Sequence, residues 1–112
     1  MSNEELDRLD RVCAEACGMR PVEESPSLWE NAQGLWPRLI PEARMTLPSF
    51  TRSWSDFGAL LLWCAEKGLA PSISGAAMGW KAWLMGPIET DRCPDPRVAL
   101  ALAVEAFSRR KE

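Results

Sequence analysis

The stretch that decides the fold is residues 72–85, which read Ser72-Ile73-Ser74-Gly75-Ala76-Ala77-Met78-Gly79-Trp80-Lys81-Ala82-Trp83-Leu84-Met85. Two short apolar runs separated by a glycine are typical of a β-hairpin rather than of a helix. We therefore predict a strand over 72–78 and its hairpin partner over 80–85, joined across Gly79. In the second strand, Trp80, Ala82 and Leu84 are expected to face one way, and Lys81, Trp83 and Met85 the other.

Helices are predicted on both sides of this hairpin. Ser2 followed by Glu5 is a capping-box pattern, and apolar residues then recur at helical spacing up to Gly18. A second helix is predicted over 52–67, capped by Ser49 or Thr51, and its broad apolar face, which includes Trp54, is expected to pack against a sheet. Asp95 and Pro96 predict the start of a third helix over 96–110, whose nearly continuous apolar sequence indicates a central position.

Residues 19–48 have a different character, because five prolines interrupt every long helix there. The segment also contains Trp29 and Trp36, and it is too apolar for a disordered linker. We predict an ordered but irregular segment, with one short helical turn around 27–33, that either binds a partner or covers the core. Residues 1–112 as a whole are predicted to form one α+β domain, a small sandwich of three main helices packed on a short antiparallel sheet.

The composition argues against catalysis. The chain has 112 residues, six tryptophans, no histidine, no tyrosine and a formal net charge of −3. The commonest general base and neutral metal ligand is therefore missing, and no carboxylates, lysines or serines stand in a known catalytic pattern. Cys13, Cys17, Cys64 and Cys93 match no zinc-site spacing and are expected to be buried free thiols. We predict no enzyme activity, no catalytic residue, no metal site and no cofactor.

The charge and hydropathy patterns bear on location and partners. The acidic opening residues lack the apolar core of a secretory signal, and the longest apolar stretches are too short to cross a bilayer, so we expect a cytoplasmic protein without a membrane partner. The acidic balance also argues against binding to a phosphate backbone. Trp36-Pro37-Arg38 and Trp80-Lys81 do combine aromatic and cationic side chains, which leaves single-stranded nucleic-acid binding as a minor alternative.

Three local matches make the chain resemble the phage ABA sandwich domain family. They are the leading segment from Glu5 to Met19, the segment from Pro48 to Gly68 with its serine-capped helix, and Gly79-Trp80-Lys81-Ala82 followed by the alanine-rich helix after Pro94-Asp95-Pro96. Residues 20–48 fall outside this pattern. The resemblance implies a compact α/β sandwich from a phage or prophage, and it supplies no catalytic residue.

The function expected from these observations is that of a non-enzymatic phage accessory protein that binds a host protein or a small ligand, for example in counter-defence. Six tryptophans exceed what so small a core needs, and the expected contact residues are Trp29, Trp36, Arg38, Trp80 and Lys81. A competing prediction is self-association, in which the exposed hairpin edge over 72–77 pairs with the same edge of a second copy in an assembly role.

Overall fold

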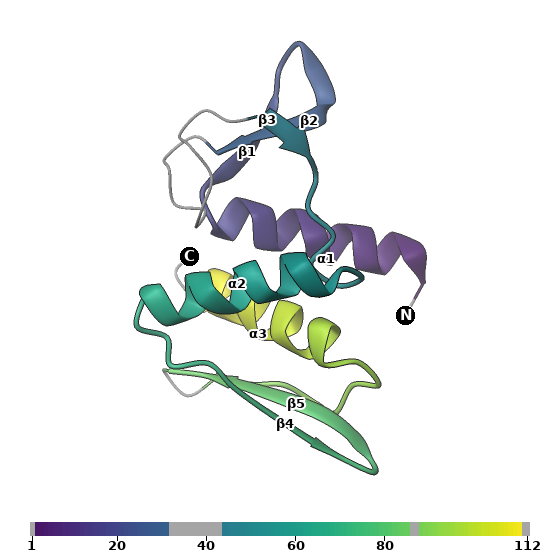
Figure 1. Ribbon diagram of the computed structural model, residues 1–112, viewed down its shortest axis with the longest axis vertical. Helices are drawn as coiled ribbons and strands as arrows, with labels where there is room; N and C mark the ends of the chain where they lie inside the picture. The colour runs from purple at the N-terminus through teal and green to yellow at the C-terminus, as the bar shows by residue number, and fades with distance from the viewer. Residues whose placement is uncertain (1, 32–43, 86–87, 111–112) are drawn as a thin grey trace.

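The computed structural model describes residues 2–31, 44–85 and 88–110. It is a compact α+β globule in which three helices lie between two small antiparallel sheets (Figure 1). One sheet has the order β1-β2-β3 and the other the order β4-β5-β6. The elements are α1 (Asn3–Ala16), β1 (Met19–Val22), β2 (Ser25–Asn31), β3 (Arg44–Thr46), α2 (Trp54–Glu66), β4 (Ser72–Ala76), β5 (Gly79–Leu84), β6 (Ile88–Glu89) and α3 (Pro96–Arg110).

Helix α1 begins and ends where the sequence predicts. The Ser2 hydroxyl accepts a hydrogen bond from the Glu5 N–H at 3.2 Å, which satisfies one of the free donors of the first turn. Gly18 follows the helix with a φ of +87°, a left-handed conformation that lets the chain turn away. The buried face of the helix contains Leu9 and Cys13, and it packs against α3.

The first sheet corrects the prediction of an irregular segment over 19–48 with a helical turn around 27–33. The described part of that segment forms β1, β2 and β3, and residues 27–31 are extended. Pro21 is compatible with this sheet because β1 is an edge strand, and the pairing register shifts between Pro21 and Val22. The prolines of this segment suggest irregular structure, but a proline excludes a helix without excluding an edge strand.

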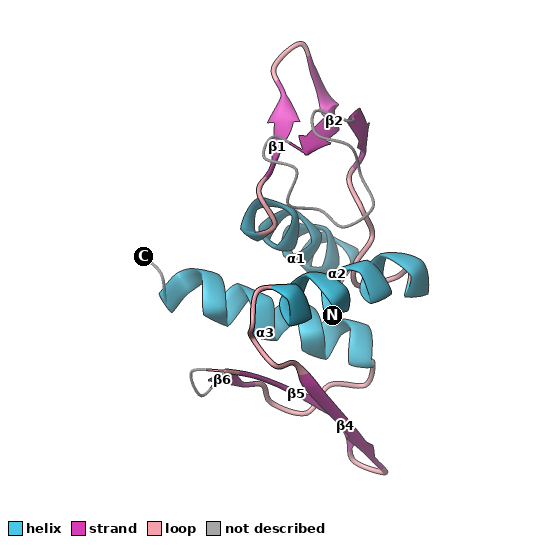
Figure 2. Cartoon of the chain, turned by 60° about the vertical axis from the view of Figure 1, so that its left-hand side comes forward, coloured by secondary structure: helices cyan, strands magenta, loops and turns pink. Residues whose placement is uncertain are grey.

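Helix α2 differs from the prediction in its start and in its packing. Its N-cap is Ser53, whose hydroxyl accepts from the Asp56 N–H at 3.3 Å, rather than Ser49 or Thr51. The helix packs against another helix, α3, rather than against a sheet (Figure 2). Its buried face consists of Leu60, Trp63 and Cys64. Trp54 is 59% exposed, so the expectation that this side chain belongs to the packed face is wrong.

Helix α3 has the predicted bounds and occupies the centre of the molecule. The Asp95 carboxylate accepts a hydrogen bond from the Arg97 N–H at 2.8 Å and so caps the first turn. Small and aliphatic residues from Val98 to Val104 allow neighbours to approach on several sides, and α3 contacts α1, α2 and the second sheet. Leu100 and Val104 are fully buried, and with Leu9 of α1 they form part of the main core.

The second sheet contains the predicted hairpin and one additional strand. β4 and β5 pair with Ser72 opposite Trp83 and with Ala76 opposite Gly79, so Ala77 and Met78 form the connecting loop. Ala82 and Leu84 are buried beneath α3, which confirms the expected alternation along β5. The short strand β6 pairs with the far end of β5, with Glu89 opposite Trp83 and Ile88 opposite Leu84.

Candidate functional site: the tip of the β4–β5 hairpin

The β4–β5 hairpin extends beyond the helices, and its tip is the most exposed apolar part of the described chain (Figure 2). Met78 lies in the connecting loop and is 80% exposed. Gly79 follows with a φ of +119°, and a Cβ at this position would lie 2.9 Å from the Cys93 carbonyl oxygen. A glycine is therefore needed here both for the backbone conformation and for the close approach of the Cys93 backbone.

Trp80 is fixed at the base of the tip by its backbone and by its ring. Its N–H donates to the Cys93 carbonyl at 2.7 Å, and its carbonyl accepts from the Cys93 N–H at 2.8 Å. The six-membered part of the indole lies across Gly75 on β4, because a Cβ on Gly75 would be only 2.6–2.7 Å from three of its carbons. The tryptophan thus covers the bare backbone of the opposite strand and is still 37% exposed.

A shallow hollow of about 410 Å³ opens beside the tip. The turn residues from Ala76 to Trp80 line one side and Arg92, Cys93 and Pro94 line the other. Arg92 is exposed, and its guanidinium donates to the Gly79 carbonyl at 3.5 Å. The hollow therefore combines an exposed methionine and an indole with one positive charge, which is suited to an apolar group that carries a nearby carboxylate.

The residues predicted to contact a partner do not form a single patch. Trp29 is only 5% exposed, on β2, and so does not fit a contact role. Trp80 and Lys81 are adjacent in sequence but lie on opposite faces of β5, and Lys81 pairs with Glu89 at 2.5 Å on the outer face. The hydrogen bond from Lys81 lowers the pKa of Glu89. Trp36 and Arg38 lie outside the described residues.

Sequence reasoning missed Met78 and Arg92 as parts of the site. Met78 was assigned to a strand, because the turn was expected at Gly79 rather than over residues 77–78. A two-residue loop places its second residue at the outermost point of the hairpin, which explains the exposure of this side chain. The position of Arg92 depends on the bridge between Trp80 and Cys93, and no local pattern signals that bridge.

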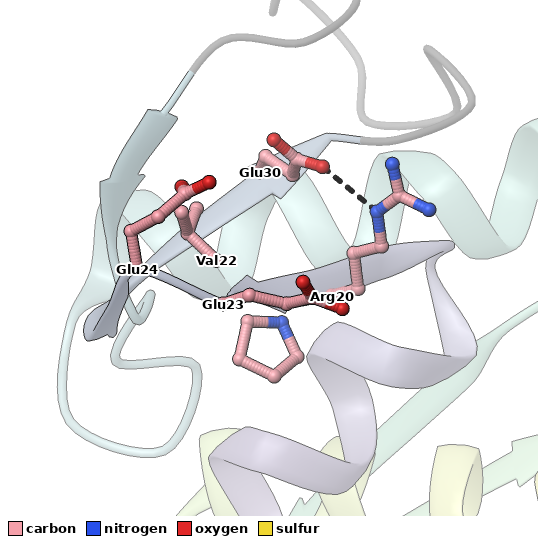
Figure 3. Close-up of a pocket in the computed structure, with 6 residues that line it drawn as sticks. Arg20, Val22, Glu23, Glu24 and Glu30 are labelled. Carbon is pink, nitrogen blue, oxygen red and sulfur yellow. Dashed lines mark hydrogen bonds and ion pairs between the residues drawn. The ribbon is translucent and has the colours of Figure 1, made fainter.

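A second hollow lies under the β1–β2 turn and is predominantly acidic (Figure 3). Arg20, Glu23, Glu24 and Glu30 line it together with Pro21 and Val22, and its volume is about 340 Å³. The Arg20 Nε donates to Glu30 at 2.8 Å, while the side chains of Glu23 and Glu24 point in different directions. This arrangement does not bring two carboxylates together for acid–base chemistry.

The cysteines are buried and free, as predicted. Burial raises the pKa of all four thiols, and that of Cys64 reaches about 12. These groups are therefore protonated at neutral pH and are poor nucleophiles. Within residues 2–31, 44–85 and 88–110, no group of three or more histidine, cysteine, aspartate or glutamate side chains is arranged to hold a metal ion.

Comparisons with protein-family models, with curated proteins and with solved structures found no match to this chain. The resemblance to the phage ABA sandwich domain family therefore stays a prediction from the sequence. Among the helices of the described residues, none combines the length and the apolar character that a bilayer crossing requires.

Proposed function

We propose that this protein is a non-enzymatic interaction module that binds a partner protein with the tip of the β4–β5 hairpin. The observation that carries the proposal is the exposure of Met78 on a hairpin that extends beyond the helices, beside Trp80, which is 37% exposed. Burial of an isolated methionine and an indole in an interface removes apolar area from water. Tryptophan and arginine are also enriched among residues that dominate binding energy.

The chemistry of the hollow suggests what the partner presents. Met78 offers a flexible apolar contact that adapts to differently shaped surfaces. Arg92 adds a positive charge within the same hollow. Among the described residues, its guanidinium makes one hydrogen bond, to the Gly79 carbonyl at 3.5 Å. The surface fits a protein that inserts an apolar side chain next to an aspartate or glutamate. Under the resemblance given above, this partner is a protein of the phage host.

The nature of the other polar groups supports binding rather than catalysis. The thiols are buried with raised pKa values, and the chain has no histidine. The buried carboxylate of Asp10 is fully used in structural contacts with Thr51 and Arg52. Cys93 lines the hollow at the tip, but burial raises the pKa of its thiol.

A comparative capture experiment tests the proposal. The tagged full-length protein and a Met78→Ser/Arg92→Ser variant are used as baits in a nuclease-treated lysate of the source cells, and bound proteins are quantified by mass spectrometry. Met85→Ser is the matched control, because Met85 is also an exposed methionine, at 59%, but lies at the opposite end of β5. Circular dichroism establishes that the variants are folded.

We expect one protein to be retained by the wild-type bait and the Met85→Ser bait, and to be reduced at least about tenfold on the tip variant. Titration calorimetry with the purified partner then measures the same difference directly. Equal retention by the tip variant would refute the proposed surface. The wild-type capture is repeated in a lysate without nuclease, and retention seen only there would instead favour the alternative of single-stranded nucleic-acid binding.

A further inference from the structure

The free edge of β4 differs from the other sheet edges formed by the described residues. β1 is protected by Arg20, Pro21 and a register shift, β3 contains only three residues, and β6 contains only two. Charges, prolines, irregular pairing and short length are the usual means by which edge strands avoid pairing with another chain. β4 has five residues without a charge, a proline or a bulge, and four of the five are exposed.

The backbone groups on this edge can be assigned from the bonds that β5 makes on its other side. Trp80 exchanges two backbone hydrogen bonds with Cys93, while Ala82 accepts from the Thr90 N–H and donates its own N–H to the Thr90 hydroxyl. Because pairs alternate in an antiparallel ladder, the residues opposite them on β4 occupy positions that are not hydrogen-bonded to β5. Those residues are Gly75 and Ile73, so the N–H and C=O groups of both point outward from the sheet.

We propose that β4 pairs antiparallel with β4 of a second copy of this chain, around a two-fold axis that passes through Ser74. In this register Ile73 of one copy lies opposite Gly75 of the other, and the same pair recurs on the far side of the axis. Every outward donor and acceptor of the two residues then finds a partner. The two sheets join into one continuous sheet with a closed, isologous interface.

The sequence of β4 favours this register over its neighbours. A shift of the axis to Ile73 would place Gly75 opposite Pro71, which has no N–H to donate. With the axis at Ser74, the two exposed serine side chains meet at a close pair on the outer face and can hydrogen-bond to each other. On the inner face, Ile73 of the second copy lies next to Gly75, within reach of the Trp80 ring that already covers this glycine.

The β4 edge lies on a different side of the hairpin from Met78 and Arg92, while Ala76 and the Trp80 ring border both surfaces. The hollow at the tip lies toward Cys93 and Pro94, whereas the β4 edge lies on the opposite side of β5. Failure of one proposal therefore leaves the other standing. A five-residue edge makes a small interface, so we expect association that depends on concentration between about 1 μM and 1 mM.

Charge substitutions at the two-fold axis provide the sharpest test. Ser74 is exposed and lies opposite Lys81 on β5, so Ser74→Glu adds a favourable cross-strand pair within one copy. In the dimer the same change places two glutamates directly opposite each other. Ser74→Lys gives the corresponding lysine pair. Each variant alone is expected to self-associate at least about tenfold more weakly than wild type, and an equimolar mixture of the two is expected to restore the dimer.

Sedimentation velocity over the concentration series measures these states, with Met85→Glu as a control on the same face of the sheet but away from the edge. Amide hydrogen exchange identifies the interface, because the Ile73 and Gly75 N–H groups should become protected only at high concentration. The Ser74 N–H, which points toward β5, should be protected throughout. A wild-type monomer across the series, or a dimer whose Ile73 and Gly75 amides exchange rapidly, would overturn the proposal.

Discussion

Replacement of Asp10 by alanine is expected to destabilise the protein much more than replacement of its neighbour Asp7, although both carboxylates bind the same arginine. Asp10 is 1% exposed and accepts hydrogen bonds from the Thr51 N–H, the Thr51 hydroxyl and the Arg52 guanidinium, each at 3.0 Å. Asp7 also bonds to Arg52, but the Asp7 side chain is 49% exposed. Both variants remove a contact with Arg52, but only Asp10→Ala also leaves the buried N–H and hydroxyl of Thr51 without their acceptor.

The magnitude follows from what the deletion leaves behind. Thr51 is 1% exposed, so its N–H and hydroxyl would lose their acceptor in a place that water does not reach. At about 1–3 kcal/mol for each unsatisfied buried group, Asp10→Ala should lower the free energy of unfolding by about 2–6 kcal/mol. Arg52 remains hydrated and contributes little to this loss. Asp7→Ala removes an exposed ion pair and should cost at most about 1 kcal/mol.

Urea unfolding followed by far-UV circular dichroism measures both values, and the slopes of the transitions show whether the unfolded states are comparable. Asp10→Asn provides an intermediate case, because its side-chain oxygen can still accept from Thr51 while the charge opposite Arg52 is lost. We expect it to cost about 1–3 kcal/mol. The reasoning would be refuted if Asp10→Ala and Asp7→Ala differed by less than about 1 kcal/mol.

Further predictions concern acid stability, the exposed tryptophan and the thiols. The hydrogen bond from Arg97 lowers the pKa of Asp95. The ionised Asp95 carboxylate therefore stabilises the fold above about pH 4, and this contribution is lost as the pH falls through the lowered pKa. Asp95→Asn should flatten that part of a curve of unfolding free energy against pH. Trp54→Ala should lower the free energy of unfolding by about 1–2 kcal/mol, because it removes the cation–π contact with Arg97 at 4.3 Å and the edge contact with Phe57. Leu60→Ala removes a fully buried side chain and should cost about 2–5 kcal/mol in the same urea assay. A thiol reagent at pH 8 should label none of the cysteines rapidly in the native protein and all of them in urea, and rapid native labelling would contradict their assigned burial.

The elements that sequence reasoning identified correctly are those whose signals are local. The Ser2 cap, the Asp95 cap and the alternation along β5 each depend on a few neighbouring residues, and the structure contains all three. The first sheet was missed because its prolines resemble loop punctuation, which hides the local β1–β2 hairpin, and because β2 and β3 pair residues that are distant along the chain, such as Leu28 and Thr46. A proline at an edge strand and a proline in a loop give the same local pattern.

The candidate site was predictable only in part for a related reason. Trp80 was identified from its residue type, but its exposure depends on how far the hairpin extends past α3. Trp54 shows the opposite error, because its position on the apolar face of a predicted helix indicated burial. Trp54 opens α2 directly after the Ser53 cap and meets Arg97 in the first turn of α3, so its ring contacts an exposed end of that helix and stays 59% exposed. Residue type and spacing define a helix face, but not where along its length the neighbour ends.

The two sheets are attached to the helices to different degrees. β4, β5 and β6 all contact α3, whereas in the described part of the chain the first sheet meets the helical layer mainly where β1 follows α1 (Figure 1). Met19 and Trp29 are the side chains of the first sheet that belong to the main core cluster. Such narrow attachment permits cooperative opening of one substructure while the rest stays native. We therefore expect the molecule to fluctuate between a complete form and one that lacks only the β1–β2–β3 sheet, at a lower free-energy cost than global unfolding.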